Sequence, residues 1–323
     1  MAEAAHAPAF LRSQDFEIAA VADASPKRLQ AAQALFPGAR AYADAQSLYA
    51  AEKLDFVDIA TPPHLHYAQC LEALGRRLHV LCEKPLVFSA REFEALKAES
   101  LSRKRALFPV HNWKYAPPLM KMHELLRSGA VGELRHLELH VLRRKPAAVA
   151  GKGGGNWRTD RAKAGGGILV DHGWHNLYLL SWLMGSAPAG MDAVLHPPHG
   201  AADEEATCLL RFAKPPATAL MHLSWRAPLR AQWGLAYGRS GSLELQDDRL
   251  VLRRGEEPPR TFQFAQKLSA GSAHPEWFAA MLPDFRAALA SPAEPSPTLA
   301  EAGICAELIE RAYRPQPAEA LRR

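Results

Sequence analysis

Two short stretches of this chain carry the side chains that could do chemistry. The first reads AGGGILVDHGWH and places three successive glycines, Gly165–Gly167, ahead of Asp171, His172 and His175. Asp171 and His175 are spaced i, i+4, so they share one face if the segment is helical. A carboxylate and an imidazole held beside a glycine platform can bind a hydroxyl group and take its proton. The alternative is a helix start in which Asp171 caps its own amides and the histidines are merely partly buried.

The second stretch is Cys82-Glu83-Lys84-Pro85, which follows the apolar run 78–81. An ammonium group at the end of a buried strand is unusual unless a partner is present. Its charge could stabilise negative charge that develops on a substrate oxygen. The alternative is a structural lysine that pairs with Glu83 or Asp58.

The bulk composition excludes several classes of protein. The chain has 323 residues, of which 48% are hydrophobic and 23% charged, as expected for a globular protein of two domains. Its four cysteines are far apart in the sequence, which argues against disulfides and structural zinc and favours the reducing cytoplasm. No signal peptide is readable, and no run of about 18 apolar residues could span a membrane.

The net charge of +5 raises the question of nucleic acid binding. The densest basic group, Arg143-Arg144-Lys145, is short and lacks interleaved aromatic residues. We therefore expect no nucleic acid partner, since an anionic substrate or cofactor accounts for the excess charge more simply.

Strands that alternate with helices of ten or so residues predict a parallel, doubly wound α/β sheet in the first part of the chain. The expected strands are 16–22 (a buried one), 39–42, 55–60, 78–82 and 106–110, and the expected helices are 2–13, 26–35, 45–51, 66–74 and 89–102. In the second part, longer strands that alternate polar with apolar residues predict a mostly antiparallel sheet with one solvent-exposed face. These are strands 133–143, 207–212, 218–226, 233–238 and 241–245, with helices at 117–128, 275–290 and 297–313. The glycine-rich segment 146–156 lacks the flanking elements of a phosphate-binding fingerprint, so we interpret it as a loop.

Several motifs recur together along almost the whole chain. They are Asp23 after the first expected strand, the turn Thr61-Pro62-Pro63-His64, the Glu83-Lys84-Pro85 turn, Trp157-Arg158, and the glycines followed by Asp171 and His175. Their order and spacing resemble the glucose–fructose oxidoreductase, inositol dehydrogenase and rhizopine catabolism (Gfo/Idh/MocA) family of NAD(P)-dependent oxidoreductases. This resemblance implies a Rossmann-like domain over residues 1–110 and an α+β domain for substrate binding and oligomerisation over residues 111–323.

The resemblance also implies roles for individual residues on the cofactor side. Asp23 would accept hydrogen bonds from the adenosine ribose and favour NAD over NADP, although a helix-capping Asp23 is the alternative. The other residues implied to contact the cofactor are Thr61, Pro62, His64, Glu83 and Lys84. His66 is expected to start the next helix rather than contact anything, and the Lys84–Pro85 bond is expected to be cis.

On the substrate side, Lys84, Asp171 and His175 would be catalytic. His175 would act as the general acid or base, and Asp171 would hold the substrate hydroxyl and set the tautomer or pKa of His175. Trp157, Arg158 and His172 would line the substrate pocket, and Arg158 could meet a carboxylate or phosphate. No metal is expected, because hydride transfer to nicotinamide needs none.

Three features depart from the family pattern. The segment 111–117 replaces a position that is often Arg, and Tyr178 stands where an Asp commonly follows the histidine. The sequence also starts without the first strand and glycine-rich turn of a dinucleotide fold, about a dozen residues. That strand would lie between the strands at 16–22 and 55–60. A late start, a loss of cofactor binding, and replacement by another segment are the three explanations.

The expected function is reversible oxidation of a secondary alcohol on a sugar, cyclitol or similar polyol, with NAD(H) as hydride carrier. A homo-oligomer, dimer or tetramer, is expected because the sheet of this family commonly mediates assembly. The rival hypothesis is a non-catalytic binding or accessory protein that keeps the pocket but binds no nucleotide.

Overall fold

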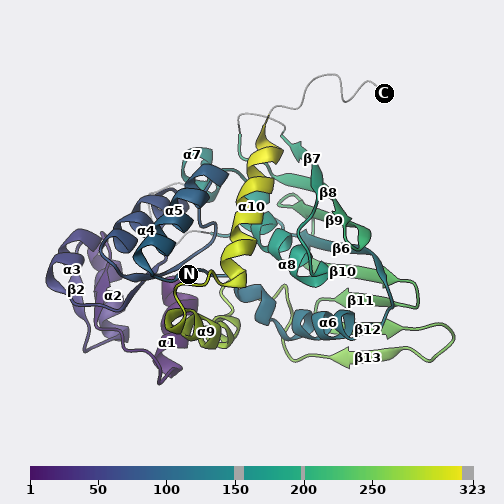
Figure 1. Cartoon of the computed structure of the whole chain (residues 1–323), viewed down its shortest axis with the longest axis horizontal. Coiled ribbons are helices and arrows are strands. Elements are labelled where there is room, and N and C mark those ends of the chain that lie inside the picture. The colour runs from purple at the N-terminus through teal and green to yellow at the C-terminus, as the bar shows by residue number, and fades with distance from the viewer. Residues whose placement is uncertain (149–155, 198–200, 315–323) are drawn as a thin grey trace.

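The computed structural model describes residues 1–148, 156–197 and 201–314, so most of the predicted loop 146–156 lies outside the described residues. Parallel strands alternate with helices at the start of the chain, as the pattern predicts (Figure 1). The strands are β1 (Ala20–Ala22), β2 (Arg40–Tyr42), β3 (Phe56–Ile59), β4 (His79–Cys82) and β5 (Leu107–Pro109). The helical segments are η1 (Ala2–His6), α1 (Ala7–Arg12), α2 (Pro26–Leu35), α3 (Ala45–Ala51), η2 (Pro63–Leu65), α4 (His66–Gly75) and α5 (Ala90–Arg103).

These strands form two parallel sheets instead of one. β1 pairs with β2, and β3-β4-β5 form a separate sheet; within the described residues no strand bridges β1 and β3. The gap falls where the family's first strand is expected. The prediction that the first strand of this chain is buried is wrong, because Ala20 and Val21 are half-buried and Ala22 is exposed. Without a paired neighbour on that edge, β1 lacks the cover that a central strand receives.

Aromatic side chains pack beside β3. The ring of Phe56 lies 5.5 Å from that of Phe16 and 5.3 Å from that of Phe285, and Phe10 belongs to the same cluster. Phe285 comes from α9 (Pro275–Ala290), close to the end of the chain. The core of the first part is therefore completed by a helix from the last part.

The second part is built on one eight-stranded sheet. The strands are β6 (Leu134–Leu142), β7 (Gly190–His196), β8 (Glu205–Ala213), β9 (Pro216–Ser224), β10 (Ala231–Gly238), β11 (Ser242–Gln246), β12 (Arg249–Arg253) and β13 (Arg260–Gln263), in the order β13-β12-β11-β10-β6-β9-β8-β7. Only β6 and β9 pair in parallel among these strands, which confirms the expected mostly antiparallel sheet. β7, β12 and β13 were not predicted.

Helices cover one face of this sheet. α6 (Pro117–Arg127) packs on β11 and β12, and α8 (Trp174–Met184) packs on β6. The remaining helical segments of this part are η3 (Asn112–Tyr115), η4 (Trp157–Thr159), α7 (Arg161–Ala164), η5 (Leu169–Gly173) and α10 (Pro297–Tyr313). α10 runs between the two parts and contacts α5 and β5 on one side and α8 and β7 on the other (Figure 1). Within the described residues, no helix is long and apolar enough to cross a bilayer.

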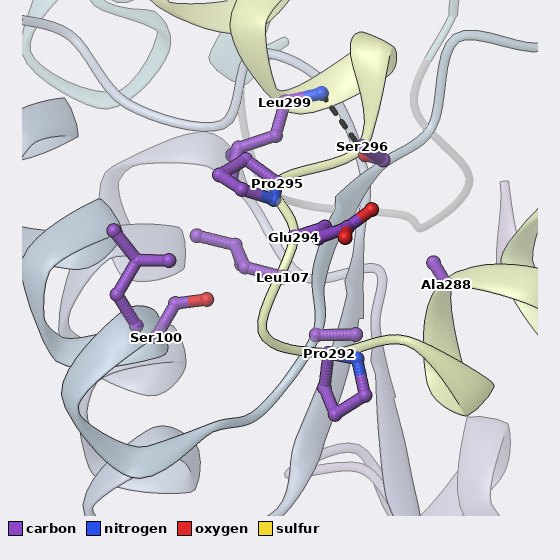
Figure 2. A pocket seen from close by; sticks show the side chains of 10 residues that line it. Ser100, Leu107, Ala288, Pro292, Glu294, Pro295, Ser296 and Leu299 are labelled. Atoms are coloured by element: carbon purple, nitrogen blue, oxygen red, sulfur yellow. Dashed lines mark hydrogen bonds between the residues drawn. The ribbon is translucent and has the colours of Figure 1, made fainter.

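A small hollow lies where α10 begins. It is bounded by Ser100, Leu107, Ala288 and the turn 292–296, and Ser296 caps the helix by accepting a hydrogen bond from the Leu299 amide (3.2 Å, Figure 2). The hollow has room for about one water molecule, so it is no candidate for a sugar or nucleotide site.

Candidate active site

Lys84 and Asp171 meet at the junction of the two parts of the chain. The Lys84 Nζ donates to Asp171 Oδ1 at 2.9 Å and to the Asp171 backbone oxygen at 2.5 Å. Lys84 follows β4, and Asp171 lies in η5. Two residues that are 87 positions apart in the sequence are thus joined, and the structural pairing of Lys84 with Glu83 or Asp58 is not the one observed.

Asp171 is held in its ionised form. Burial alone would raise the pKa of its carboxyl, but the charges of Lys84, His172 and Arg158 outweigh burial and hold that pKa far below its usual range. Arg158 Nε lies 3.6 Å from Asp171 Oδ2, and His172 Nε2 lies 4.0 Å from the same oxygen. The carboxylate therefore faces three nitrogen-bearing side chains, two of them on the substrate side that the sequence predicts.

His175 lies one helical turn beyond Asp171. Its side chain is 7% exposed and stacks on the Trp113 ring at 4.9 Å. Burial, together with the charges of Lys84 and His172, lowers the pKa of His175 well below 6.5, so its imidazole is neutral at physiological pH. The shared face predicted from the i, i+4 spacing places His175 within electrostatic reach of both Lys84 and Asp171.

The ring nitrogen Nδ1 of His175 is bonded to Tyr178, not to Asp171. The distance from Nδ1 to the Tyr178 hydroxyl is 2.9 Å, and the same hydroxyl oxygen accepts the Trp113 backbone N–H at 3.2 Å. Asp171 therefore does not fix the tautomer of His175 through Nδ1, because its carboxylate pairs with Lys84. Its charge does act on the pKa of His175, which it raises against the effect of burial. Tyr178, which stands where the family commonly has an Asp, contacts the Nδ1 of His175 instead.

A buried network supports Tyr178. His111 stacks on the Tyr178 ring at 3.9 Å, and its Nε2 accepts the Trp174 indole N–H at 3.0 Å. This fixes the His111 proton on Nδ1, which donates to Glu301 at 3.1 Å. Lys114 reaches both oxygens of Glu301 at 2.9 Å. The segment 111–117, which departs from the family pattern, is thus the support of the histidine site.

The three glycines serve the protein itself. Gly165 has φ +80°, and a Cβ on Gly167 would lie 1.9 Å from the Asp203 backbone oxygen. Asp203 is 1% exposed and accepts the amides of Gly167 and Leu169 at 2.8 and 2.9 Å, and Tyr313 donates to the same carboxylate. The glycines, expected to form a platform for a ligand, instead allow the backbone to contact Asp203 closely. The hydrogen bonds to Asp203 fix the start of η5.

On the cofactor side, the Lys84–Pro85 bond is cis, as expected. His66 locks this turn, because its Nδ1 lies 2.7 Å from the Pro85 oxygen and its Nε2 lies 2.8 Å from the Thr61 oxygen. His66 is the first residue of α4, as expected, but it also makes these two contacts, which were not expected. The turn at Thr61 follows β3, and the turn at Lys84 follows β4. Because β3 and β4 are parallel neighbours, both turns lie at the same edge of the sheet.

Of the other residues implied to bind the cofactor, Thr61, Pro62 and His64 lie at the same edge, whereas Asp23 follows β1 in the separate two-stranded sheet. Thr61 donates to Gln69 at 2.6 Å, Pro62 precedes η2, and His64 is exposed within η2. Asp23 Oδ1 accepts the Ser25 amide at 2.7 Å, a local turn just before α2, whose N-cap is Ser25 and not Asp23. The alternative of a helix-capping Asp23 is therefore not the observed geometry.

Sequence reasoning missed His6, which bridges two carboxylates beneath the Lys84 turn. Its Nδ1 lies 2.7 Å from Asp58 Oδ2, and its Nε2 lies 2.9 Å from Glu83 Oε1. Burial lowers the pKa of His6, but the charges and hydrogen bonds of Asp58 and Glu83 prevail and raise it to about 9. Glu83 in turn accepts the Lys84 backbone N–H at 2.9 Å, so His6 fixes the turn that carries Lys84.

Trp157 and Arg158 lie together in η4. The Arg158 guanidinium stacks over the Trp157 ring at 4.3 Å and faces Asp171. Among the described residues, no group of three or more His, Cys, Asp and Glu side chains is placed to hold a metal ion.

Two matches to known sequence families fit this geometry. Residues 1–111 match the oxidoreductase family with an NAD-binding Rossmann fold, and residues 119–244 match the GFO/IDH/MocA C-terminal domain. The rhizopine catabolism protein MocA of Rhizobium meliloti is 30% identical over 247 residues, which cover 74% of this chain and 73% of MocA. This chain belongs to the Gfo/Idh/MocA family.

Other relatives match shorter stretches. The D-glucoside 3-dehydrogenase of Escherichia coli (strain K12) is 27% identical over 185 residues, which cover 57% of this chain and 51% of that enzyme. The chain thus spans about half the length of such curated relatives. The structure of levoglucosan dehydrogenase with NADH and levoglucosan superposes with a TM-score of 0.81 at 23% identity and covers 97% of this chain and 93% of that one, which shows the Gfo/Idh/MocA fold.

The His6 bridge predicts a pH dependence of stability. Because the pKa of His6 is raised from 6.5 to about 9 in the folded state, the stabilisation is complete below pH 6.5 and is lost as the pH rises through 9. We expect the free energy of unfolding of the native chain to exceed that of His6→Gln by at most about 3 kcal/mol at pH 6, with the difference shrinking toward pH 10. Urea unfolding across this range measures it, and a difference that grows with pH would contradict the assignment.

The Tyr178 contact predicts a spectroscopic outcome in this Gfo/Idh/MocA protein. A neutral hydroxyl beside His175 cannot offset burial, whereas a carboxylate can. We expect Tyr178→Asp to raise the pKa of His175 by about 1 to 3 pH units, as measured by NMR of the imidazole. Tyr178→Phe is the matched control and should leave that pKa low. An equal effect of both substitutions would mean that the contact does not govern His175.

Proposed function

We propose that this chain catalyses the reversible, NAD-dependent oxidation of a secondary alcohol on a sugar, cyclitol or similar polyol. The observation that carries the proposal is the Lys84–Asp171 pair, which joins the cofactor edge of the first part to the histidine helix of the second. Family membership and the sugar dehydrogenases among the relatives support it. NADP is the less suitable cofactor, because Asp23 would repel a 2′-phosphate.

The described residues fit the two ends of such a cofactor. Asp23 would offer the ribose hydroxyls the carboxylate oxygen that does not bind the Ser25 amide, and Lys84 reaches into the junction where a nicotinamide ring would lie. Thr61, Pro62, His64 and Glu83 belong to the turns at the same edge. Residues 1–37 contain no glycine, so this segment offers the pyrophosphate no glycine turn. When bound, NAD accepts the hydride from the alcohol carbon.

The side chains divide the remaining chemistry. The Lys84 ammonium binds the reacting oxygen and stabilises the negative charge that develops on it. Asp171 holds the ammonium in place and accepts a hydrogen bond from a substrate hydroxyl. His175 takes the hydroxyl proton in oxidation and returns it in reduction, and its low pKa keeps it ready to act as a base at neutral pH. Trp157, Arg158 and His172 line the pocket.

Replacing the proposed base tests the mechanism. We expect His175→Ala to lower kcat by about 10²- to 10⁴-fold, since that is the usual contribution of a positioned acid or base. His123→Ala, which removes a histidine stacked on Trp182 away from the site, is the control. Undiminished turnover by His175→Ala in NADH-coupled assays with sugars and cyclitols would refute the role.

The rival function is a non-catalytic binding protein. The observation that favours it is that no strand among the described residues pairs between β1 and β3, where a dinucleotide fold has its central strand. Titration with NADH separates the two functions, because binding enhances or quenches nicotinamide fluorescence. Saturable binding supports the oxidoreductase, and no change at millimolar NADH supports the binding protein.

We further propose a division of the chain near residue 110, a cytoplasmic location and a homo-oligomer. The cysteines support the location: Cys70 and Cys82 are both buried and free although they lie close enough to interact. The face of the large sheet opposite α6 and α8 supports assembly. It exposes large apolar side chains, namely Val194 (72%), Leu209 (40%), Trp233 (37%) and Tyr237 (43%).

A charge placed on that face tests the oligomer. We expect the native chain to run as a dimer or tetramer in light-scattering chromatography and Leu209→Glu to shift it toward monomer, because a desolvated carboxylate opposes association. Leu101→Glu places the same charge on α5, outside the sheet, and should leave the assembly intact. A monomeric native chain would overturn this proposal.

A further inference from the structure

Arg143 is a buried cation at the end of β6. Arg143 is 3% exposed. Burial and, to a smaller extent, the charge of Arg230 lower the pKa of its guanidinium to about 10, so the side chain remains protonated at neutral pH. Burying a charge costs several kcal/mol unless an opposite charge or good hydrogen bonds offset it. A buried guanidinium therefore has to be explained by its partners.

The partners that the structure provides are all neutral. The Nη1 group donates to the backbone oxygens of Leu142 and Ala231 at 2.9 and 3.0 Å, and Nη2 donates to Gln232 Oε1 at 3.1 Å. Among the described residues no carboxylate forms an ion pair with Arg143, and its buried Nε has no hydrogen-bond acceptor. The Nε–H and the second Nη2–H are thus left for another acceptor.

Packing places Arg143 beside the candidate active site. Its backbone N–H donates to the Ser224 oxygen at the end of β9 (2.8 Å). The neighbouring Leu223 lies against Gly173 of η5, next to His172. Arg143 and Asp171 also interact electrostatically. Burial and the charge of Arg143 lower the pKa of His172 to about 3, against the opposing effect of Asp171. Arg143 therefore belongs to the same region as the Lys84–Asp171 pair.

Two further nitrogens in this region are buried without a hydrogen-bond acceptor among the described residues. They are Arg158 Nε, which stays 3.6 Å from Asp171 Oδ2, and His172 Nδ1. Three unsatisfied nitrogens around one site are unusual in a folded protein, where buried donors are almost always paired. All three are able to donate to the same kind of group.

An aromatic wall joins the basic side chains to the histidine. Trp113 stacks on His175 and lies 6.0 Å from His274, which stacks on Trp277 at 3.6 Å. His274 in turn feels the charges of Arg230 and Arg143. Trp113 and Trp277 are themselves buried, so this packing connects His175 with the surroundings of Arg143 through the protein interior.

We propose that the substrate is a sugar or polyol acid whose carboxylate binds Arg143, with His172 and Arg158 as neighbouring donors. This inference rests on the proposed function, because it assigns the other end of the same substrate. The free edge of a guanidinium matches a planar carboxylate with two parallel hydrogen bonds. A sugar phosphate would present the same kind of oxygens, so the experiment includes it as a separate arm.

The experiment compares acids with neutral isosteres in the native chain. D-glucuronate and D-galacturonate are assayed with NAD against their primary amides, their parent hexoses and the corresponding hexose 6-phosphates. We expect kcat/KM for at least one acid to exceed that of its amide by about tenfold or more, in keeping with a hydrogen bond to a charged group. In parallel, the same acids should raise the Tm of the NADH-loaded protein and the amides should not.

Substitutions locate the preference. Arg143→Gln should lower the ratio of kcat/KM for the acid to that for the amide by about tenfold and abolish the Tm shift. Arg143→Lys should restore part of both readouts, because lysine returns the charge without the two parallel N–H donors of the guanidinium. Arg254→Gln removes an exposed arginine paired with Glu257 and should keep both readouts. If Arg143→Gln fails to fold, Arg158→Gln and the native comparison of acid with amide still decide the question.

The outcomes separate this inference from the proposed function. Equal turnover of acids, amides and hexoses overturns the inference and leaves the oxidoreductase standing. A preference for the 6-phosphates over both carboxylate and amide overturns the assignment of a carboxylate. Tm shifts by acids that depend on Arg143, without turnover of any sugar, support the acid site and overturn the proposed oxidation.

Discussion

The contact between Lys84 and Asp171 is the constraint on which the site depends. A buried ion pair pays for the removal of both charges from water, so it persists only where further hydrogen bonds and a rigid geometry favour it. Lys84 is positioned by its turn, which His66 and Glu83 stabilise through hydrogen bonds. Asp171 is positioned by η5, whose start is fixed by hydrogen bonds from the backbone amides to Asp203. These contacts fix the position of the first part of the chain relative to the second.

Much of the architecture could be predicted from the sequence, because strong periodicity marks the long elements. The parallel strands, the helices between them and the central strands of the large sheet were expected close to their observed bounds. The strands β12 and β13, next to and at one edge of the sheet, could not be found, since they are short and begin with arginine, so their stability comes from pairing with neighbours. The split of the parallel strands into two sheets likewise depends on which strands lie beside each other.

The site was predictable only where a motif carries it. Lys84, Asp171 and His175 stand in recognisable surroundings, and the i, i+4 spacing places the last two on one face. Asp203 and His6 could not be found, because their contacts with Gly167 and Glu83 cross long distances in the sequence. Tyr178 was recognised only as a departure, since a sequence does not tell where a phenol oxygen points.

The position of α9 has a consequence for how the molecule is made. Phe278 and Phe285 complete the core of the first part, where they pack against Phe10 and Phe108. During synthesis the ribosome has to deliver the whole of the large sheet before these rings arrive. The earliest part of the chain therefore waits with an open apolar core, in the period when nascent chains are most exposed to aggregation and to chaperones. The order of translation and the order of core closure are opposed in this protein.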